Sequence, residues 1–203
     1  MDAYHFEMLE GKKVLIVGEV GSGKTALTAR LLREAIVAIG PAKITAIDMA
    51  PRRKQFKRVV VGGRLTDFMR GDAEMRILVP AGKLHAPRIE GKTANEVVYL
   101  ARVNAQLIQE LLEAYLMAPT PILFINDVSM YLLAGEVKPL LKVVKLAETF
   151  VANSYEGLTL GQNHDSGISK REKSGLSLLK KAMDYVVPMS ATASSPFEPA
   201  SAV

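Results

Sequence analysis

The 203-residue sequence contains no cysteine, which excludes disulfide bonds and metal sites built on thiolates. No apolar run approaches the roughly 20 residues that a membrane-spanning helix needs. Residues 1–10 are mixed and acidic, unlike the basic and apolar start of a signal peptide. We therefore expect a cytoplasmic protein that makes no use of a membrane.

The composition that remains is typical of a globular α/β protein. Hydrophobic residues make up 49% of the chain, which is enough for a large core, and its length suits one domain. There is no internal repeat. We expect a single domain over residues 1–189 and a disordered tail over residues 190–203, which are rich in Ala, Ser and Pro.

The net charge of +5 comes from one short stretch, residues 52–58. Its five cations are Arg52, Arg53, Lys54, Lys57 and Arg58; without them the 26 basic residues fall to 21 and balance the 21 acidic ones. Such a run is either a solvated face or a surface that contacts the phosphates of RNA or DNA. Phe56 is the only aromatic residue there, so stacking on single strands is weakly indicated.

Residues 18–25 read GEVGSGKT, which matches G-x-x-x-x-G-K-[ST], the phosphate-binding loop called Walker A. Residues 13–17 before it are apolar and of strand length, and apolar residues recur at helical spacing from 27 to 39 after it. Strand, glycine loop and helix are the setting that the motif requires. The predicted nucleotide-binding residues are Gly18, Glu19, Val20, Gly21, Ser22, Gly23, Lys24, Thr25 and Ala26.

The residue types explain the chemistry expected of this loop. Glycines allow backbone conformations closed to residues with a β-carbon, so successive N–H groups can face an anion at the start of a helix. Lys24 is expected to reach the β- and γ-phosphates, and the Thr25 hydroxyl to bind Mg²⁺.

These features resemble the P-loop NTPase superfamily. The resemblance implies a three-layer α/β/α sandwich with a mostly parallel sheet, with ATP or GTP and Mg²⁺ as cofactors. Glu19 stands where the MinD-type branch carries a lysine, and the guanine-reading N-K-x-D sequence is absent, which lowers the GTPase option. A RecA- or HerA-like motor would explain the basic stretch.

Residues 121–127, PILFIND, resemble the Walker B strand, whose aspartate holds Mg²⁺. We assign that role to Asp127. Many P-loop ATPases place a glutamate next, but Val128 follows here. In an alternative register, Asn126 takes the aspartate position and Asp127 stands in for the glutamate. Lys24, Asp127 and Asn126 are therefore the candidate catalytic residues, and the identity of the base stays open.

Further candidates lie at the ends of the other predicted strands, because ligands of open parallel sheets bind there. Asp48 ends a strand over residues 43–48 and is either a metal ligand, with Thr25 and Asp127, or a turn residue. Residues 76–79 form a third short strand, and His85 and Arg88 lie in the loop 80–92 that follows, where they can cover a nucleotide.

The remaining chain alternates between helices and strands. Gly62-Gly63 indicates a hairpin insert over about residues 57–68, and Thr93 with Glu96 forms a capping box for a helix that runs to residue 117. The favoured fifth strand is residues 149–153, because its β-branched and aromatic residues are typical of strands, and the alternative is residues 158–162. The last strand, residues 185–189, contains a proline and belongs near a sheet edge.

Residues 154–171 are expected to form a polar loop, of a length that is often functional. Lys170 and Arg171 are its candidates for a lid or an arginine finger on the γ-phosphate.

Three functions fit this sequence. The first is an Mg²⁺-dependent NTPase that hydrolyses ATP. The second is a small-molecule kinase on the same fold, with Asp48 as a base or anchor. The third is a nucleotide-controlled binding module or nucleic-acid motor, read by a protein partner or by nucleic acid through residues 52–58.

Overall fold

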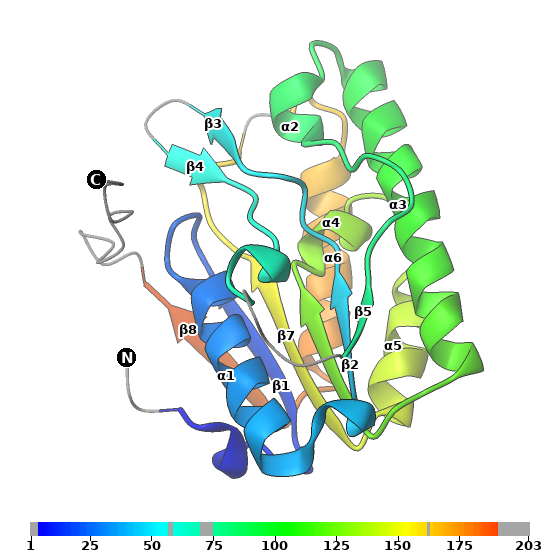
Figure 1. Cartoon of the computed structure of the whole chain (residues 1–203). Helices are drawn as coiled ribbons and strands as arrows, with labels where there is room; N and C mark the ends of the chain where they lie inside the picture. Colours follow the sequence, from blue (N-terminus) through cyan, green and yellow to red (C-terminus); the bar gives the residue numbers. More distant parts are fainter. Residues whose placement is uncertain (1–3, 57–58, 70–74, 162, 191–203) are drawn as a thin grey trace, which may run out of the picture.

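The central sheet is built from short, nearly continuous apolar segments, the pattern of strands that are buried on both faces. In this computed structural model, which describes residues 4–56, 59–69, 75–161 and 163–190, six strands pair in the order β5-β2-β6-β7-β1-β8, and every pair is parallel (Figure 1). They are β1 (Lys13–Gly18), β2 (Ile44–Asp48), β5 (Arg76–Leu78), β6 (Ile122–Asn126), β7 (Thr149–Tyr155) and β8 (Tyr185–Met189).

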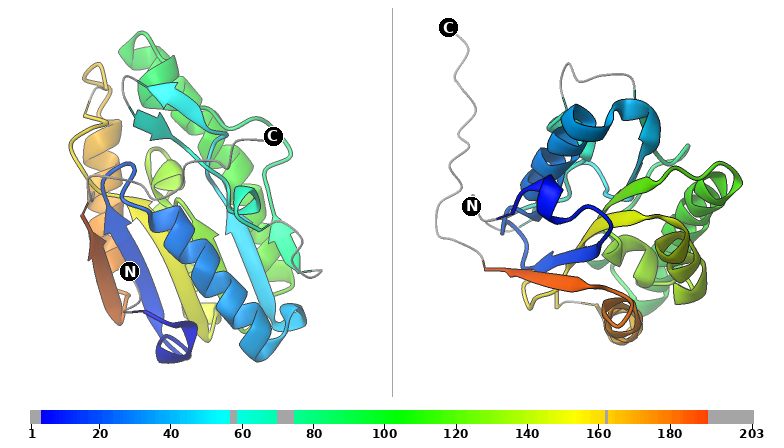
Figure 2. Two further views of the ribbon diagram at one scale, coloured as in Figure 1. Left: turned by 60° about the vertical axis from the view of Figure 1, so that its left-hand side comes forward. Right: turned by 90° about the horizontal axis from the view of Figure 1, so that it is seen from below.

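Helices cover both faces of the sheet (Figure 2). The helices are α1 (Lys24–Ile39), α2 (Pro87–Glu90), α3 (Ala94–Met117), α4 (Ser129–Leu132), α5 (Val137–Leu146) and α6 (Ile168–Lys180), with short 3-10 turns η1 (Phe6–Met8), η2 (Pro41–Lys43) and η3 (Leu65–Asp67). One face packs against α1, η1 and η3, and the other against α3, α4, α5 and α6. The predicted α/β/α sandwich is confirmed.

Alternation along the strands divides the core into two clusters. Val14 and Ile16 of β1 point to the α1 side, whereas Leu15 and Val17 point to the α3 side. The helix α3 begins as predicted, since the Thr93 side chain accepts a hydrogen bond from the Glu96 N–H. None of the helices in the described residues is long and apolar enough to cross a membrane.

The strand order sets which side chains can meet. Because β7 lies between β1 and β6, the residues that end these three strands come together at one edge of the sheet. The favoured position of the fifth strand is confirmed, since β7 starts at Thr149, whereas residues 158–160 are bend and turn. The predicted third strand and the edge position of β8 are confirmed as well.

Two predicted local structures are wrong in detail. The hairpin pairs β3 (Lys54–Phe56) with β4 (Val59–Val61), so Gly62-Gly63 follows the second strand instead of forming the turn. Gly62 has a φ of 75°, and a β-carbon there would lie 2.7 Å from the Pro51 carbonyl oxygen, so the tight return to the sheet explains the glycine. Residues 57–58 lie outside the described residues.

The predicted loop 154–171 is shorter than expected. β7 extends to Tyr155 and α6 begins at Ile168, which places Lys170 and Arg171 in the first turn of a helix. The loop 80–92 contains the short helix α2. The predicted disordered tail falls, apart from its first residue, on residues outside the described ranges.

Candidate functional site

The glycine loop connects the end of β1 to the start of α1. Gly21 and Gly23 have φ values of 75° and 86°, in the left-handed region that favours glycine. Lys24 is the first residue of α1, and its Nζ donates hydrogen bonds to the carbonyl oxygens of Gly18 at 2.9 Å and Glu19 at 2.7 Å. Burial lowers the pKa of Lys24, and the nearby Asp127 carboxylate opposes this shift. The Lys24 ammonium group thus lies against the glycine loop, where it and the loop N–H groups can bind the same phosphate.

The Glu19 side chain joins this loop to the segment after β7. Its carboxylate accepts hydrogen bonds from the N–H groups of Leu158 at 2.7 Å and Thr159 at 3.1 Å, and from Val20 at 2.9 Å. Burial raises the pKa of Glu19, but these N–H donors outweigh burial and leave the pKa lowered. A β-carbon on residue 157 would lie 2.2 Å from the Glu19 carboxylate, so a larger residue at Gly157 would displace this side chain.

Asn126 at the end of β6 is the residue that meets Thr25. The Thr25 hydroxyl donates to the Asn126 Oδ1 at 3.2 Å. The Asn126 Nδ2 donates to the carboxylate of Asp48 at 2.8 Å and to the Gly63 carbonyl oxygen at 3.0 Å. Since the carbonyl oxygen can only accept and the carboxylate is an acceptor whenever it is ionised, the orientation of the amide is determined, and its oxygen faces Thr25.

Asn153 on β7 completes this network. It was not identified from the sequence as a candidate site residue. Its Oδ1 accepts the Asp127 N–H at 3.0 Å, and its Nδ2 donates at 2.9 Å to both Asn126 Oδ1 and the Thr28 hydroxyl. It is 2% exposed. The available signal was a polar residue late in an apolar strand, but only the position of β7 between β1 and β6 gives that residue its neighbours.

Asp48 lies behind Asn126, away from Thr25. One of its oxygens accepts the Leu65 N–H at 2.7 Å, and the other accepts from Asn126 and from the Ala50 N–H at 3.3 Å. Burial raises the pKa of Asp48 to about 6 against these hydrogen bonds. Both oxygens are engaged, so the carboxyl group is placed to orient Asn126 and to hold η3 against the sheet.

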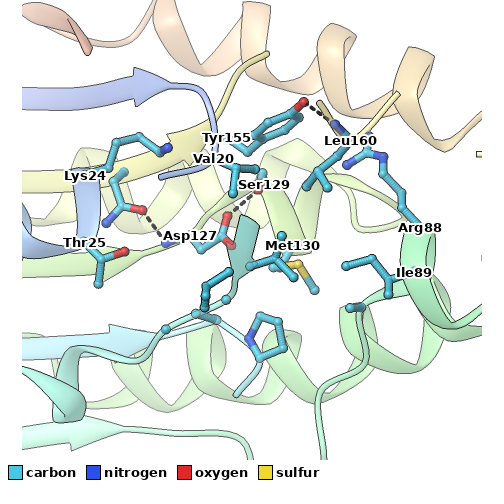
Figure 3. A pocket seen from close by; sticks show the side chains of 18 of the residues that line it. Val20, Lys24, Thr25, Arg88, Ile89, Asp127, Ser129, Met130, Tyr155 and Leu160 are labelled. Atoms are coloured by element: carbon cyan, nitrogen blue, oxygen red, sulfur yellow. Dashed lines mark hydrogen bonds between the residues drawn. The ribbon is translucent and has the colours of Figure 1, made fainter. Parts of the chain in front are cut away.

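Asp127 follows β6 with a φ of 62° and lines a pocket with Lys24 and Thr25 (Figure 3). The Ser129 hydroxyl donates to its carboxylate. Burial raises the pKa of Asp127, while the Ser129 hydrogen bond and the Lys24 charge lower it. The carboxyl group therefore stands in the pocket, across from the lysine of the glycine loop.

These oxygen atoms fit Mg²⁺ that arrives with phosphates. Mg²⁺ is usually bound by one or two carboxylates together with substrate phosphates and water. The Thr25 hydroxyl and the Asp127 carboxylate line the pocket at the mouth of the loop and could supply such oxygen atoms. The Asn126 Oδ1 lies behind them and accepts hydrogen bonds from Thr25 and Asn153. Within the described residues, no group of three or more His, Cys, Asp and Glu side chains could hold a metal ion by itself.

Arg88 on α2 lines the same pocket from the opposite side. Its Nη2 donates to the Glu172 carboxylate at 2.5 Å and to the Ser169 hydroxyl at 3.0 Å, and its guanidinium carbon lies 5.8 Å from the centre of the Tyr155 ring. The Arg88 and Glu172 side chains are 9% and 8% exposed. Among the described residues, the buried Arg88 Nε has no hydrogen-bond partner.

Glu90 ties the hairpin to α2 and so shapes this opposite wall. Its carboxylate pairs with the Lys54 ammonium, lies 2.8 Å from the His85 Nδ1 and accepts the Ala86 N–H at 3.0 Å. Burial raises its pKa, but hydrogen bonds from Lys54 and His85 outweigh burial and bring the pKa of Glu90 down to about 2. His85 thus contributes to structure here; the pocket is lined by its neighbour Ala86.

The basic stretch is partly neutralised. Lys54 pairs with Glu90, and the Arg53 Nε lies 3.3 Å from an Asp67 carboxylate oxygen. Arg52 is exposed, and Lys57 and Arg58 lie outside the described residues.

The two predicted finger residues do not line the pocket beside the glycine loop. Arg171 donates to the Glu136 carboxylate at 2.6 Å and lines a separate cavity beside Leu133 and Ile168. Lys170 lies next to it in α6.

No protein-family model and no curated protein matches the chain. Among solved structures, the chain is similar to the flagellar accessory protein FlaH from Methanocaldococcus jannaschii, with 11% identity and a TM-score of 0.49 over 88% of this chain and 71% of that one. It is similar to PH0250 from Pyrococcus horikoshii OT3, with 12% identity and a TM-score of 0.44 over 91% and 85% of the two chains.

A further similarity is to the Hef helicase domain of Pyrococcus furiosus, with 12% identity and a TM-score of 0.44 over 93% of this chain and 37% of that one. The fold class rests on the parallel sheet and its two helical layers.

Proposed function

We propose that this protein binds a nucleoside triphosphate, ATP first among the candidates, together with Mg²⁺, and hydrolyses it to a diphosphate and phosphate. The observation that carries the proposal is the loop between β1 and α1, where left-handed Gly21 and Gly23 lead into the N-terminus of a 16-residue helix that begins with Lys24. Backbone N–H groups and the helix dipole stabilise phosphate at such a terminus.

Each polar side chain at this edge then has a role in the proposal. Lys24 exchanges its contacts with the Gly18 and Glu19 carbonyl oxygens for the β- and γ-phosphate oxygens. The Thr25 hydroxyl, oriented by Asn126, would hold Mg²⁺, which would neutralise charge on the phosphate oxygens. Asn153 and Asp48 orient these groups through the hydrogen bonds described above.

Asp127 is the proposed acceptor of the proton from water. Water oxygen bonds to the γ-phosphorus, the bond to the diphosphate oxygen breaks, and the proton passes to the Asp127 carboxylate. Burial raises the pKa of this group, which makes its carboxylate a stronger base. This assignment uses the alternative register, since it is Asn126 that meets the Thr25 hydroxyl.

The test is incubation with Mg²⁺ and ATP labelled at the γ-phosphate, with and without a pool of metabolites, and the same with GTP. Labelled free phosphate that disappears in Lys24→Ala supports hydrolysis. A labelled small molecule supports a kinase instead, and tight binding without either product supports a nucleotide-controlled binding module. Absence of nucleotide binding would overturn the proposal.

One observation favours the kinase as a second candidate. The wall that faces Lys24 across the pocket is mainly apolar, with Ile89, Met130 and Leu160 among its residues. A site for water alone has no need of such a wall.

A further inference from the structure

The pocket beside Lys24 continues past the polar edge of the sheet into an apolar space (Figure 3). Its far wall comes from four separate segments and consists of Val60, Pro87, Ile89, Met130, Leu133 and Leu160. The whole cavity measures about 130 Å³. An apolar cavity of about 150 Å³ holds one benzene molecule. The volume found here includes the polar edge beside Lys24 and Thr25, so the apolar part can take a group of no more than about one ring.

The apolar space adjoins the part of the glycine loop that is expected to bind the terminal phosphates, and not the nucleoside. The loop residues that line the cavity are Val20, Gly21, Lys24 and Thr25, and the last two are those expected at the β- and γ-phosphates and at Mg²⁺. A triphosphate held by these residues would run from this end toward its nucleoside, which would leave the apolar space beyond the terminal phosphate.

Arg88 provides a charged group at the edge of this space. Burying a guanidinium is costly unless its hydrogen bonds are satisfied, yet the Arg88 Nε and the Glu172 Oε1 are both buried without a partner among the described residues. Figure 3 shows the Arg88 side chain extending from α2 toward Tyr155 and Leu160. An arginine held in this state has donor capacity left for an anion.

The other ionisable groups near Arg88 come from the residue after β6, from α1 and from α6. Asp127 and Glu172 are acids whose pKa values burial raises, and Lys24 is a base whose pKa burial lowers. Of the two basic groups, Arg88 is the one with a buried N–H that has no hydrogen-bond partner among the described residues, and this N–H is the donor offered to an anionic group.

We propose that this apolar space, the second-ligand chamber, binds a small molecule with an apolar body of about one ring and a single anionic group, beside the terminal phosphate of the nucleotide. The anionic group contacts Arg88, and the apolar body contacts Ile89, Met130 and Leu160. The proposal rests on the proposed nucleotide binding, because the nucleotide defines which end of the pocket stays open.

The experiment compares benzoate with benzamide, a neutral probe of the same shape. Ligand-observed NMR titration with the full chain measures the affinity of each probe. Benzoate is expected to bind at least about fivefold more tightly than benzamide, as one charge-assisted hydrogen bond predicts. Equal affinity of the two probes would overturn the role of Arg88. The double variant Arg88→Gln/Glu172→Gln, which leaves neither charge unpaired, should remove the difference between the probes.

A matched pair of leucines tests the apolar wall. Leu160→Ser should weaken benzoate about fivefold to tenfold through lost apolar contact. Leu158→Ser is the control, since Leu158 lies two residues away, is 92% exposed and is not among the residues that line the cavity. Equal effects of the two substitutions would contradict the chamber.

Saturation with a non-hydrolysable ATP analogue and Mg²⁺ separates this inference from the proposed function. Benzoate should still bind, with its affinity changed by no more than about threefold. If the analogue displaces benzoate, the chamber is the nucleoside's own site and the proposal fails while nucleotide binding stands. If the analogue does not bind at all, the proposed function fails, and the second-ligand site that rests on it fails with it.

Discussion

The glycine loop and the wall that faces it across the pocket are built in different ways. The loop consists of eight consecutive residues, 18–25, between a strand and a helix, and its conformation follows from local residue types. The wall is assembled from β4, α2, α4 and Leu160, and side-chain bonds of Glu90, Glu172 and Glu19 hold these segments in place. The conformation of the loop is thus determined by residues adjacent in sequence, whereas the facing wall is determined by tertiary contacts.

The chemistry of the two sides differs in the same way. The loop side presents a lysine, a hydroxyl group and N–H groups, which suit phosphate. The facing wall presents apolar side chains and one buried arginine, which suit a different ligand or none. Substitutions on the loop side should therefore stop nucleotide binding, whereas those on the wall should spare it.

The largest expected effect is that of Lys24→Ala. Lys24 is the fixed cation of the loop, so nucleotide turnover should fall at least about a hundredfold, as for loss of one preorganised electrostatic contact. The fold should persist, because the Lys24 side chain bonds only to its own loop. Turnover and circular dichroism measure the two quantities. Full activity with an unchanged spectrum would contradict the phosphate-binding role.

The next effect distinguishes Asp127 from Asn126. Asp127→Asn removes the proposed base and should lower kcat about a thousandfold while nucleotide affinity is kept. Asn126→Ala removes the partner of Thr25. It should chiefly weaken the apparent affinity for Mg²⁺, by about tenfold, as for groups that orient metal ligands.

Steady-state kinetics over a range of Mg²⁺ concentrations separates these two outcomes. If Asn126→Ala lowers kcat more than Asp127→Asn does, Asp127 is not the proton acceptor.

Asp48 should give the protein a pH-dependent stability that Asp48→Asn lacks. The folded-state pKa of about 6 lies above the ordinary aspartate value of 3.8, so the folded protein binds an extra proton between these pH values. Stability from this group is therefore present at low pH and is lost as pH rises through about 6, by up to about 3 kcal/mol.

Urea unfolding at about pH 4.5 and about pH 7.5 gives the free energy of unfolding of the wild type and of Asp48→Asn. The change in this free energy between the two pH values should be larger for the wild type. Identical pH responses of the wild type and the variant would show that the pKa of Asp48 is not raised on folding.

The smallest expected effect concerns the basic stretch beside the wall. If it binds nucleic acid, each phosphate contact adds about 0.7 to 0.9 to the slope of log K against log salt concentration. Because Lys54 and Arg53 already pair with Glu90 and Asp67, replacing Arg52, Arg53 and Lys54 with glutamine should change that slope by only about one.

Lys180→Gln, on α6, is the control for this change, and fluorescence anisotropy at several salt concentrations is the measurement. Loss of more than half of the slope in the triple variant would show that the ion pairs open to bind phosphates.

The sequence by itself determined the elements whose causes are local. The glycine loop, the helix after it, the Thr93 N-cap of α3 and the apolar strands follow from residue type and spacing, so the α/β/α class could be predicted. The sequence also placed Asp48, Asn126 and Asp127 at strand ends, and it left the last two with alternative roles.

Only the tertiary structure decided which of these residues meet. The insertion of β7 between β1 and β6 brings Asn153 against Asn126, and the Thr25 hydroxyl then meets an amide instead of a carboxylate. Arg88 reaches the pocket because Glu172, 84 residues away, pairs with it. Strand order and such distant contacts depend on how whole layers pack, and no short stretch of sequence encodes that packing.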